Sequence, residues 1–430
     1  MRKASAISGA SLLVLLSIFA GCSGKATSSG PDAAPDAGDA GPESTDPALI
    51  IEPEIPPVKC DVAFDKVYDI PGAAKAIAWS VVELPNGHFV VAGEAEPEVP
   101  TTPYDMDGFL MDVDKDGQLV WSSLYGQEGN GSEYDAEVFK RVHLTSGGLM
   151  ALGTKVVTST YAGAWAQYTE LDGGVVWSET LQYGGILSTY QIDADTIQFY
   201  TGDGHGNSLL ETINVNGSFE EQFHALLVPS SQYNIWGWDR FSFGYSAFVG
   251  SLYIENTTGN YQPDETTYEY PYIVILSPNY RVVASKTFRP NRSGAFGFAS
   301  GTPDGHILFG GALLYDDWTW GTYLAKVTIG GDLLWHKYYG DNDIVYLQDI
   351  TSIGDDFLLT GYYSSGAGAA DGSVAHVDGN GRVLWHWNAG HSGIAQLYTA
   401  IILSSNEYLF AGVDSSLPWL VKITPNKECY

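Results

Sequence analysis

Acidic and aromatic side chains occur together at several places in this chain of 430 residues, and two of these places supply the candidate residues. The two places are residues 236–239 and residues 315–320. Aromatic rings pack against sugar faces or cations, and carboxylates accept hydrogen bonds from hydroxyl groups. The pattern favours a face that contacts a polyhydroxylated or cationic ligand. The candidate residues are Trp236, Trp238, Asp239, Tyr315, Asp316, Asp317, Trp318 and Trp320.

Two other interpretations of these residues stay open. The rings can instead pack in the core while the acids keep the surface soluble. Asp316 or Asp317, paired with Asp239, would also supply the two carboxylates that glycoside hydrolysis needs at a separation of roughly 5–9 Å. Our first interpretation is a non-enzymatic binding face, and we assign no catalytic residue.

The elements that position these residues are short strands in a repeating unit. Apolar segments that end in glycine recur at intervals of 48 to 60 residues, and each is followed by a loop and a hairpin of alternating polarity. The glycines are Gly93, Gly153, Gly202, Gly250, Gly310, Gly361 and Gly412. Units of about 50 residues with four strands are typical of propeller blades. The sequence therefore predicts an all-β, seven-bladed propeller with four-stranded antiparallel blades over residues 60–430.

The two ends of the predicted propeller complete one blade between them. The last unit has three strands, at 396–403, 407–412 and 418–423, and the missing strand is expected at 62–68. Pairing of the N-terminal strand in the C-terminal blade would close the ring and leave no open sheet edge there. Cys60 and Cys429 flank this junction, so we expect a disulfide bond between them.

Metal and cofactor sites are not indicated. Residues 112–117 begin like a calcium loop, but Ser123 occupies the position of the closing glutamate, so a hairpin turn is favoured and calcium stays open. The nine histidines show no close pair of metal-ligand type. His336 and His386 each follow a tryptophan and are expected at equivalent surface positions of two strands. We predict no metal and no cofactor.

The charge of the chain excludes some partners. The formal net charge is −31, and residues 60–430 carry 44 acidic and 16 basic residues. Nucleic-acid binding needs clustered Lys and Arg, so it is excluded, and electrostatic docking on anionic lipid is disfavoured. We expect a monomer.

The first 59 residues predict export and attachment to a membrane. Arg2 and Lys3 precede an apolar segment at 12–20, and Gly21-Cys22 follows it, with Phe19 three residues before the cysteine. This end of the signal resembles the lipobox of bacterial lipoproteins, although Phe19 stands where that family usually has Leu. The resemblance implies a signal peptide at 1–21, lipid on Cys22 and a location at the outer membrane, on a side that we leave open. Residues 22–59 are rich in Pro, Ala and Asp and are expected to be a disordered tether.

A second resemblance concerns the repeats. Trp121, Trp177, Trp335 and Trp385 each lie in the strand after a hairpin turn, and this marking resembles the repeats of quinoprotein-like and related bacterial surface propellers. That family includes enzymes, assembly factors and binding modules, so the resemblance implies the fold and leaves the activity open. We expect a membrane-anchored binding or scaffolding lipoprotein for a glycan or a protein partner. A carbohydrate-active enzyme and an envelope-assembly factor remain as alternatives.

Overall fold

The computed structural model describes residues 50–52, 60–100, 104–126, 134–158, 161–181, 184–202, 207–226, 233–241, 244–255, 267–288, 294–314, 320–340, 346–364, 370–389 and 394–425. The chain divides into two compact units, Met1–Pro42 and Glu43–Tyr430, and every described residue belongs to the second. Within these ranges, no helix has the length and apolar character of a membrane span.

The second unit is built from β-strands, as the alternating apolar patterns predict. In chain order they are β1 (Ile50–Glu52), β2 (Asp61–Val67), β3 (Ala73–Glu83), β4 (Phe89–Pro97), β5 (Tyr104–Val113), β6 (Leu119–Tyr125), β7 (Tyr134–Leu144), β8 (Leu149–Thr158), β9 (Tyr161–Thr169), β10 (Val175–Leu181), β11 (Ile186–Gln191), β12 (Thr196–Gly202), β13 (Asn207–Asn214), β14 (Phe219–Leu226), β15 (Tyr233–Arg240), β16 (Ser246–Glu255), β17 (Thr267–Leu276), β18 (Val282–Thr287), β19 (Gly294–Gly301), β20 (Ile307–Leu314), β21 (Trp320–Val327), β22 (Leu333–Tyr339), β23 (Tyr346–Ile353), β24 (Asp356–Ser364), β25 (Ala370–Val377), β26 (Val383–Ala389), β27 (Ala395–Ile402), β28 (Tyr408–Asp414) and β29 (Leu417–Thr424).

These strands form an all-β propeller with four-stranded antiparallel blades, but not seven separate sheets. Five sheets are single blades: β11–β14, β15–β18, β19–β22, β23–β26, and β27–β29 with β2. The sixth is an eight-stranded sheet that contains β3–β10. Its halves are joined because Tyr104–Met106 of β5 pair in parallel with Tyr134–Ala136 of β7. The structure therefore shows five separate blades where the sequence predicted seven, because a non-local backbone pairing of this kind leaves no signal in the hairpin spacing.

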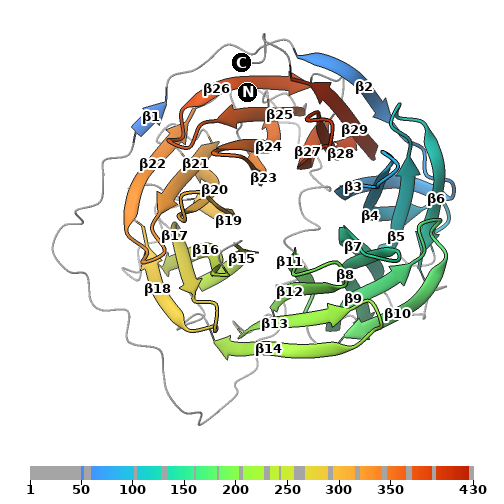
Figure 1. Ribbon diagram of the computed structural model, residues 1–430, viewed down its shortest axis with the longest axis horizontal. Coiled ribbons are helices and arrows are strands. Elements are labelled where there is room, and N and C mark those ends of the chain that lie inside the picture. Colours follow the sequence, from blue (N-terminus) through green and yellow to red (C-terminus); the bar gives the residue numbers. More distant parts are fainter. Residues whose placement is uncertain are drawn as a thin grey trace, which may run out of the picture. The chain divides into compact units, whose positions relative to one another are not determined.

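The sheets follow one another around a central axis. Strands β3, β7, β11, β15, β19, β23 and β27 are innermost (Figure 1). Each of them contacts the inner strand of the next set, and β27 contacts β3. Closure by the N-terminal strand is confirmed, because β2 pairs antiparallel with β29 over Asp61–Val67.

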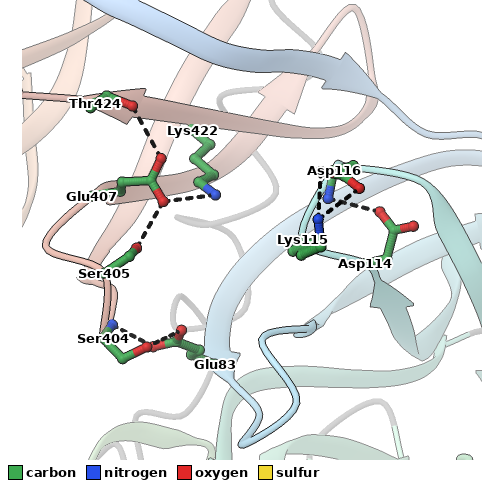
Figure 2. Close-up of polar contacts among 9 residues, drawn as sticks. All are labelled: Glu83, Asp114, Lys115, Asp116, Ser404, Ser405, Glu407, Lys422 and Thr424. Carbon is green, nitrogen blue, oxygen red and sulfur yellow. Dashed lines mark hydrogen bonds and ion pairs between the residues drawn. The ribbon is translucent and has the colours of Figure 1, made fainter.

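Polar contacts reinforce the junction between the last and first sets of strands (Figure 2). The backbone N–H and the hydroxyl of Ser404 donate to the Glu83 carboxylate, at 2.7 and 2.8 Å. Within the last blade, Glu407 accepts from Lys422 at 2.9 Å, and the Ser405 and Thr424 hydroxyls donate to it as well. These contacts join the turn before β28 to the end of β3 and stabilise that turn within its own blade.

One part of the expected tether has regular structure. Ile50–Glu52 form β1, which pairs in parallel with Lys337–Tyr339 of β22 and makes that sheet five-stranded. This corrects the expectation of disorder throughout 22–59. The physical reason is that the outer strand of a blade has an unpaired backbone edge, and an Ile-Ile pair has high β-propensity.

The tryptophan marks and the turn glycines of the repeats meet between blades. A Cβ added to Gly381, which has φ +73°, would lie 2.7 Å from the Trp335 ring of the preceding blade. Gly173 is covered in the same way by Trp121. The Tyr125 and Tyr339 hydroxyls donate to the carbonyls of the same two glycines, at 2.8 and 2.6 Å. The blades of Trp121 and Trp335 are thus each fastened to the turn of the next blade.

The expectation that the two histidines after a tryptophan lie at the surface is wrong, because both are buried. His336 and His386 lie on the outermost strands β22 and β26, but they are only 7% and 1% exposed. The Tyr323 hydroxyl contacts His336 Nδ1 at 3.1 Å. Their ladder partners, Ala325 and Ala375, both belong to buried apolar clusters.

Candidate functional site

Every inner strand carries a β-bulge at an equivalent position. Its pairing with the second strand of the set shifts by one residue, which leaves one residue without a partner in the ladder. The bulged residues are Trp79, Lys140, Leu187, Trp236, Gly297, Gln348 and Tyr398. A bulge bends its strand and re-aims the side chains that follow it, so this feature sets which residues face the axis.

The bulges explain three of the repeated glycines, Gly93, Gly153 and Gly412. A Cβ on Gly153 would lie 1.8 Å from the carbonyl oxygen of Val138, just before the bulge in β7. At Gly93 and Gly412 the corresponding distances, to the Ile77 and Gln396 oxygens, are 2.0 and 1.9 Å. In the third and fifth repeats the residues opposite the bulge are Thr201 and Gly311, one position away from the glycines expected there.

A cavity of about 230 Å³ lies among the inner strands. Its walls come from β7, β11, β15, β19 and β23, so residues far apart in sequence meet there. The lining residues are Arg141, Ser188, Thr189, Trp238, Asp239, Gly297, Phe298, Ala299, Asp349 and Ile350. We call this the axial cavity. Its polar groups are two carboxylates, one guanidinium and two hydroxyls.

The two carboxylates occupy related positions on their strands. Asp349 directly follows the bulge of β23, and Asp239 comes three residues after the bulge of β15. Because side chains alternate across a strand, both positions share the face toward the axis. Arg141 directly follows the bulge of β7 and is therefore equivalent to Asp349.

Burial raises the pKa of Asp239 to about 8, and the negative charge of Asp349 adds to the rise. A hydrogen bond of 2.8 Å from the Arg240 backbone N–H to Asp239 Oδ1 opposes it. At neutral pH this carboxyl therefore keeps its proton most of the time and can both donate and accept a hydrogen bond.

Burial also raises the pKa of Asp349. Several hydrogen-bond donors oppose this rise and orient the carboxylate. The Thr399 hydroxyl donates to Asp349 Oδ2 at 3.0 Å, and the Ile350 backbone N–H donates to Oδ1 at 2.9 Å. The positive charge of Arg141 acts against the rise. Because Thr399 belongs to β27, Asp349 is oriented by the neighbouring blade.

The basic side of the cavity is formed by β7. The Arg141 guanidinium donates to the carbonyl of Lys140 at 2.9 Å, which fixes its direction. Burial, with a further contribution from Arg141, lowers the pKa of His143 to about 4, so this imidazole is neutral at pH 7. His143 Nε2 lies 2.7 Å from the Thr189 hydroxyl. Arg141 is the cation of the axial cavity.

The structure separates the residues that the sequence grouped together. Asp239 lies in the axial cavity, as expected for a residue near the channel. Trp238 lines the same cavity but is only 3% exposed and packs against Phe248 at a ring-centroid distance of 6.3 Å, so it is a core residue. Trp236 and Trp320 lie on β15 and β21. The positions of their side chains, and the whole of Tyr315, Asp316, Asp317 and Trp318, fall outside the described residues.

The sequence analysis missed Arg141 and Asp349. The signal that points to them is positional: each lies in the first strand of its repeat, about twelve residues before the repeat glycine. Aligned on that glycine, the other repeats have Val81, Tyr190, Trp238, Phe298 and Ala400 in this column, so Arg141 and Asp349 are its two charged residues.

The Asp112–Gly117 segment is a hairpin turn. Asp114 Oδ1 accepts hydrogen bonds from the backbone N–H groups of Asp116 and Gln118, at 2.9 and 2.7 Å, and these bonds lower the pKa of Asp114. Lys115 contacts the Asp116 carboxylate (Figure 2). Asp112 pairs instead with His88 at 3.1 Å. No cluster of metal-ligating side chains occurs among the described residues.

Cys60 is disulfide-bonded. Cys22 and Cys429, the two other cysteines of the chain, lie outside the described residues. The pairing of Cys60 with Cys429 and the lipid on Cys22 therefore stay predictions.

Several solved structures are similar to this chain at low sequence identity. No family model matches the chain, and no curated protein matches it significantly. Sqt1 from Chaetomium thermophilum is 12% identical with a TM-score of 0.45, over 86% of this chain and 100% of that chain. The Dos1 propeller is 9% identical with a TM-score of 0.45, over 85% and 89%. The α-L-arabinofuranosidase Arb93A from Fusarium graminearum, in complex with an iminosugar inhibitor, is 10% identical with a TM-score of 0.45, over 75% and 98%.

Proposed function

We propose that this chain is a glycan-binding protein that holds a sugar in the axial cavity. The observation that carries the proposal is the convergence of Arg141, Asp239 and Asp349 on one cavity from three different inner strands. Charged and polar groups are costly to bury unless they are satisfied, so gathering them around a space favours a ligand that supplies hydrogen bonds. A sugar hydroxyl both donates and accepts, which suits a protonated carboxyl, a guanidinium and the Ser188 and Thr189 hydroxyls.

The proposal also covers the number of propeller blades and the attachment of the protein to a membrane. We propose that the ring has seven blades, two of them merged, because β3–β6 and β7–β10 are each a complete four-stranded antiparallel set within the eight-stranded sheet. We place the protein at the bacterial outer membrane, held by lipid on Cys22. The lipobox-like end of the signal supports this, since several acyl chains give lasting attachment. The acidic surface keeps the propeller away from anionic headgroups and nucleic acid.

A second candidate function is glycoside cleavage. The observation that favours it is the pKa of about 8 at Asp239, which keeps a proton on this carboxyl near neutral pH. A general acid in glycoside hydrolysis needs such a proton, and Asp349 would be the second carboxylate. Asp316 and Asp317, the partners of Asp239 expected from the sequence, lie outside the described residues, so that pairing stays a prediction.

A glycan array with the chain lacking residues 1–21 and with Cys22 replaced by serine tests the proposal. Binding to a defined set of glycans, lost in Arg141→Met, supports it. The same glycans are then incubated with the protein and examined for shorter products by mass spectrometry. Shorter products that disappear in Asp239→Asn establish the enzyme alternative. An empty array, with a stable protein partner in a pull-down from envelope extract, would replace both with an assembly role.

A further inference from the structure

A second cavity adjoins the axial cavity at the glycine bulge of β19. It measures about 260 Å³ and is lined by Phe296, Gly297, Phe298, Ala312, Tyr346, Leu347 and Gln348. Gly297 and Phe298 line both cavities. We call the second one the side cavity.

The two cavities have different chemistry. The axial cavity presents Arg141, Asp239 and Asp349, whereas the side cavity is lined by the half-buried Phe298 and Tyr346. Phe296 also lines it but is only 1% exposed and belongs to the core. Tyr346 in turn stacks on Tyr362, with ring centroids 4.8 Å apart and 14° between the planes. An aromatic wall thus continues from the polar cavity toward β24.

Gly297 is the position where this sheet differs from the others. The equivalent bulge residues all carry side chains: Trp79, Lys140, Leu187, Trp236, Gln348 and Tyr398. Two of them fill the space between blades, since Lys140 Nζ lies 3.7 Å from the centroid of the Trp79 ring. The φ angle of Gly297 is outside the left-handed region, so the backbone does not require glycine here. The missing side chain leaves the two cavities side by side.

The volumes support a joint site. Small-molecule sites usually measure about 300–1,000 Å³. The cavities, at about 230 and 260 Å³, each fall short of that range, and together they lie inside it.

We propose that the axial and side cavities form one elongated site for a linear oligosaccharide of at least two rings. One ring is held by the polar groups around Arg141, Asp239 and Asp349, and the next lies against the Phe298 and Tyr346 rings. Gly297 sets this specificity by leaving the passage open. The inference rests on the proposed glycan-binding function and names its ligand class.

The test uses chain length as its variable. Neutral and uronic-acid-containing saccharides are each offered as the monosaccharide and as the linear di-, tri- and tetrasaccharide, and Kd is measured by calorimetry. Wild type is expected to bind the di- or trisaccharide at least about tenfold more tightly than the monosaccharide, which corresponds to about 1.4 kcal/mol. Gly297→Gln, which introduces the bulge residue of the neighbouring sheet, should reduce this ratio to about two or less.

Two further variants make the test decisive. Ala312→Leu fills the side cavity without touching the axial one and should reduce the same ratio, even if Gly297→Gln folds poorly. Gly340→Gln is the control, because a Cβ there meets nothing within 4 Å, and its ratio should equal that of wild type. Sugar binding with no dependence on chain length, or with a ratio that both cavity variants leave unchanged, overturns the inference and leaves the proposed function standing. Binding of no saccharide at all overturns both.

Discussion

Asp239 on β15 and Asp349 on β23 line the same cavity, and the charge of Asp349 helps to raise the pKa of Asp239 to about 8. Their strands are separated by the whole β19–β22 sheet in sequence, and the ring brings them together. Thr399 and two backbone N–H groups hold Asp349, whereas one backbone N–H group bonds Asp239. Asp349 therefore has more hydrogen-bond donors than Asp239, and the raised pKa of Asp239 is the basis of the first prediction.

Asp239→Asn should make the protein more stable than wild type at pH 8 and nearly equal to it at pH 4. The unfolded Asp ionises near pH 4, whereas the folded one keeps its proton to about pH 8. Between these values the folded state binds more protons than the unfolded state, so wild-type stability falls as pH rises. The difference between variant and wild type should grow by about 1.4 kcal/mol for each unit of pKa shift. Urea unfolding at pH 4, 6 and 8 measures it.

The comparison with the variant isolates Asp239 from its neighbours. Arg141, His143 and Asp349 are present in both proteins, so their contributions cancel to first order. His143 acts in the opposite direction, because its lowered pKa makes the fold lose stability as pH falls from about 6.5 to 4. A stability difference that stays flat from pH 4 to 8 would show that Asp239 is not buried in its neutral form.

Gly153→Ala should destabilise the propeller by about 2–4 kcal/mol, because the new Cβ collides with the Val138 carbonyl oxygen at the bulge. Backbone cannot move aside as a flexible side chain does. Gly340→Ala is the matched control, with open space at its Cβ and an expected effect within about 0.5 kcal/mol. Thermal unfolding of the two variants gives the comparison, and equal melting temperatures would refute the packing argument.

Gly381→Ala should cost more than Gly87→Ala, and the difference measures the contact with Trp335. Both glycines have φ in the left-handed region, at +73° and +81°, so both variants carry a similar backbone cost of about 1–2 kcal/mol. Only the Cβ at 381 meets a ring, since nothing lies within 4 Å of the Cβ at 87. An additional loss of about 1–3 kcal/mol is expected for Gly381→Ala. In a Trp335→Ala background this additional loss should disappear.

Cys22→Ser should move the full-length protein from the membrane fraction to the soluble fraction of the cells that produce it. A single acyl chain gives only weak binding, so loss of all chains should abolish attachment. Cys429→Ser should leave the protein in the membrane fraction and instead lower its melting temperature if Cys429 is the partner of Cys60. Non-reducing peptide mapping identifies that partner directly. Membrane retention of Cys22→Ser would contradict the anchor.

The sequence repeat predicted most of the fold because each of its recurring residues is required by the local backbone or by packing nearby. The turn glycines, the tryptophans of the outer strands and the alternating segments all depend on backbone geometry or packing within one or two neighbouring sheets. The closing strand was also predictable, because one blade lacked a strand and the other end of the chain supplied it. By contrast, the parallel pairing of β5 with β7 and the docking of Ile50–Glu52 on β22 depend on edges that form only after the sheets exist.

The site divides in the same way. The sequence by itself determined that carboxylates and aromatic rings occur together in the repeats, and it named Asp239 among the candidates. Only the tertiary structure decided that Asp239 faces Asp349 and Arg141 across a cavity and that Trp238 belongs to the core. The reason is that a bulge shifts the alternation of an inner strand by one residue, so which side chains face the axis depends on a backbone feature of the strand pair. The order of the blades around the closed ring then determines which of those side chains line the same cavity.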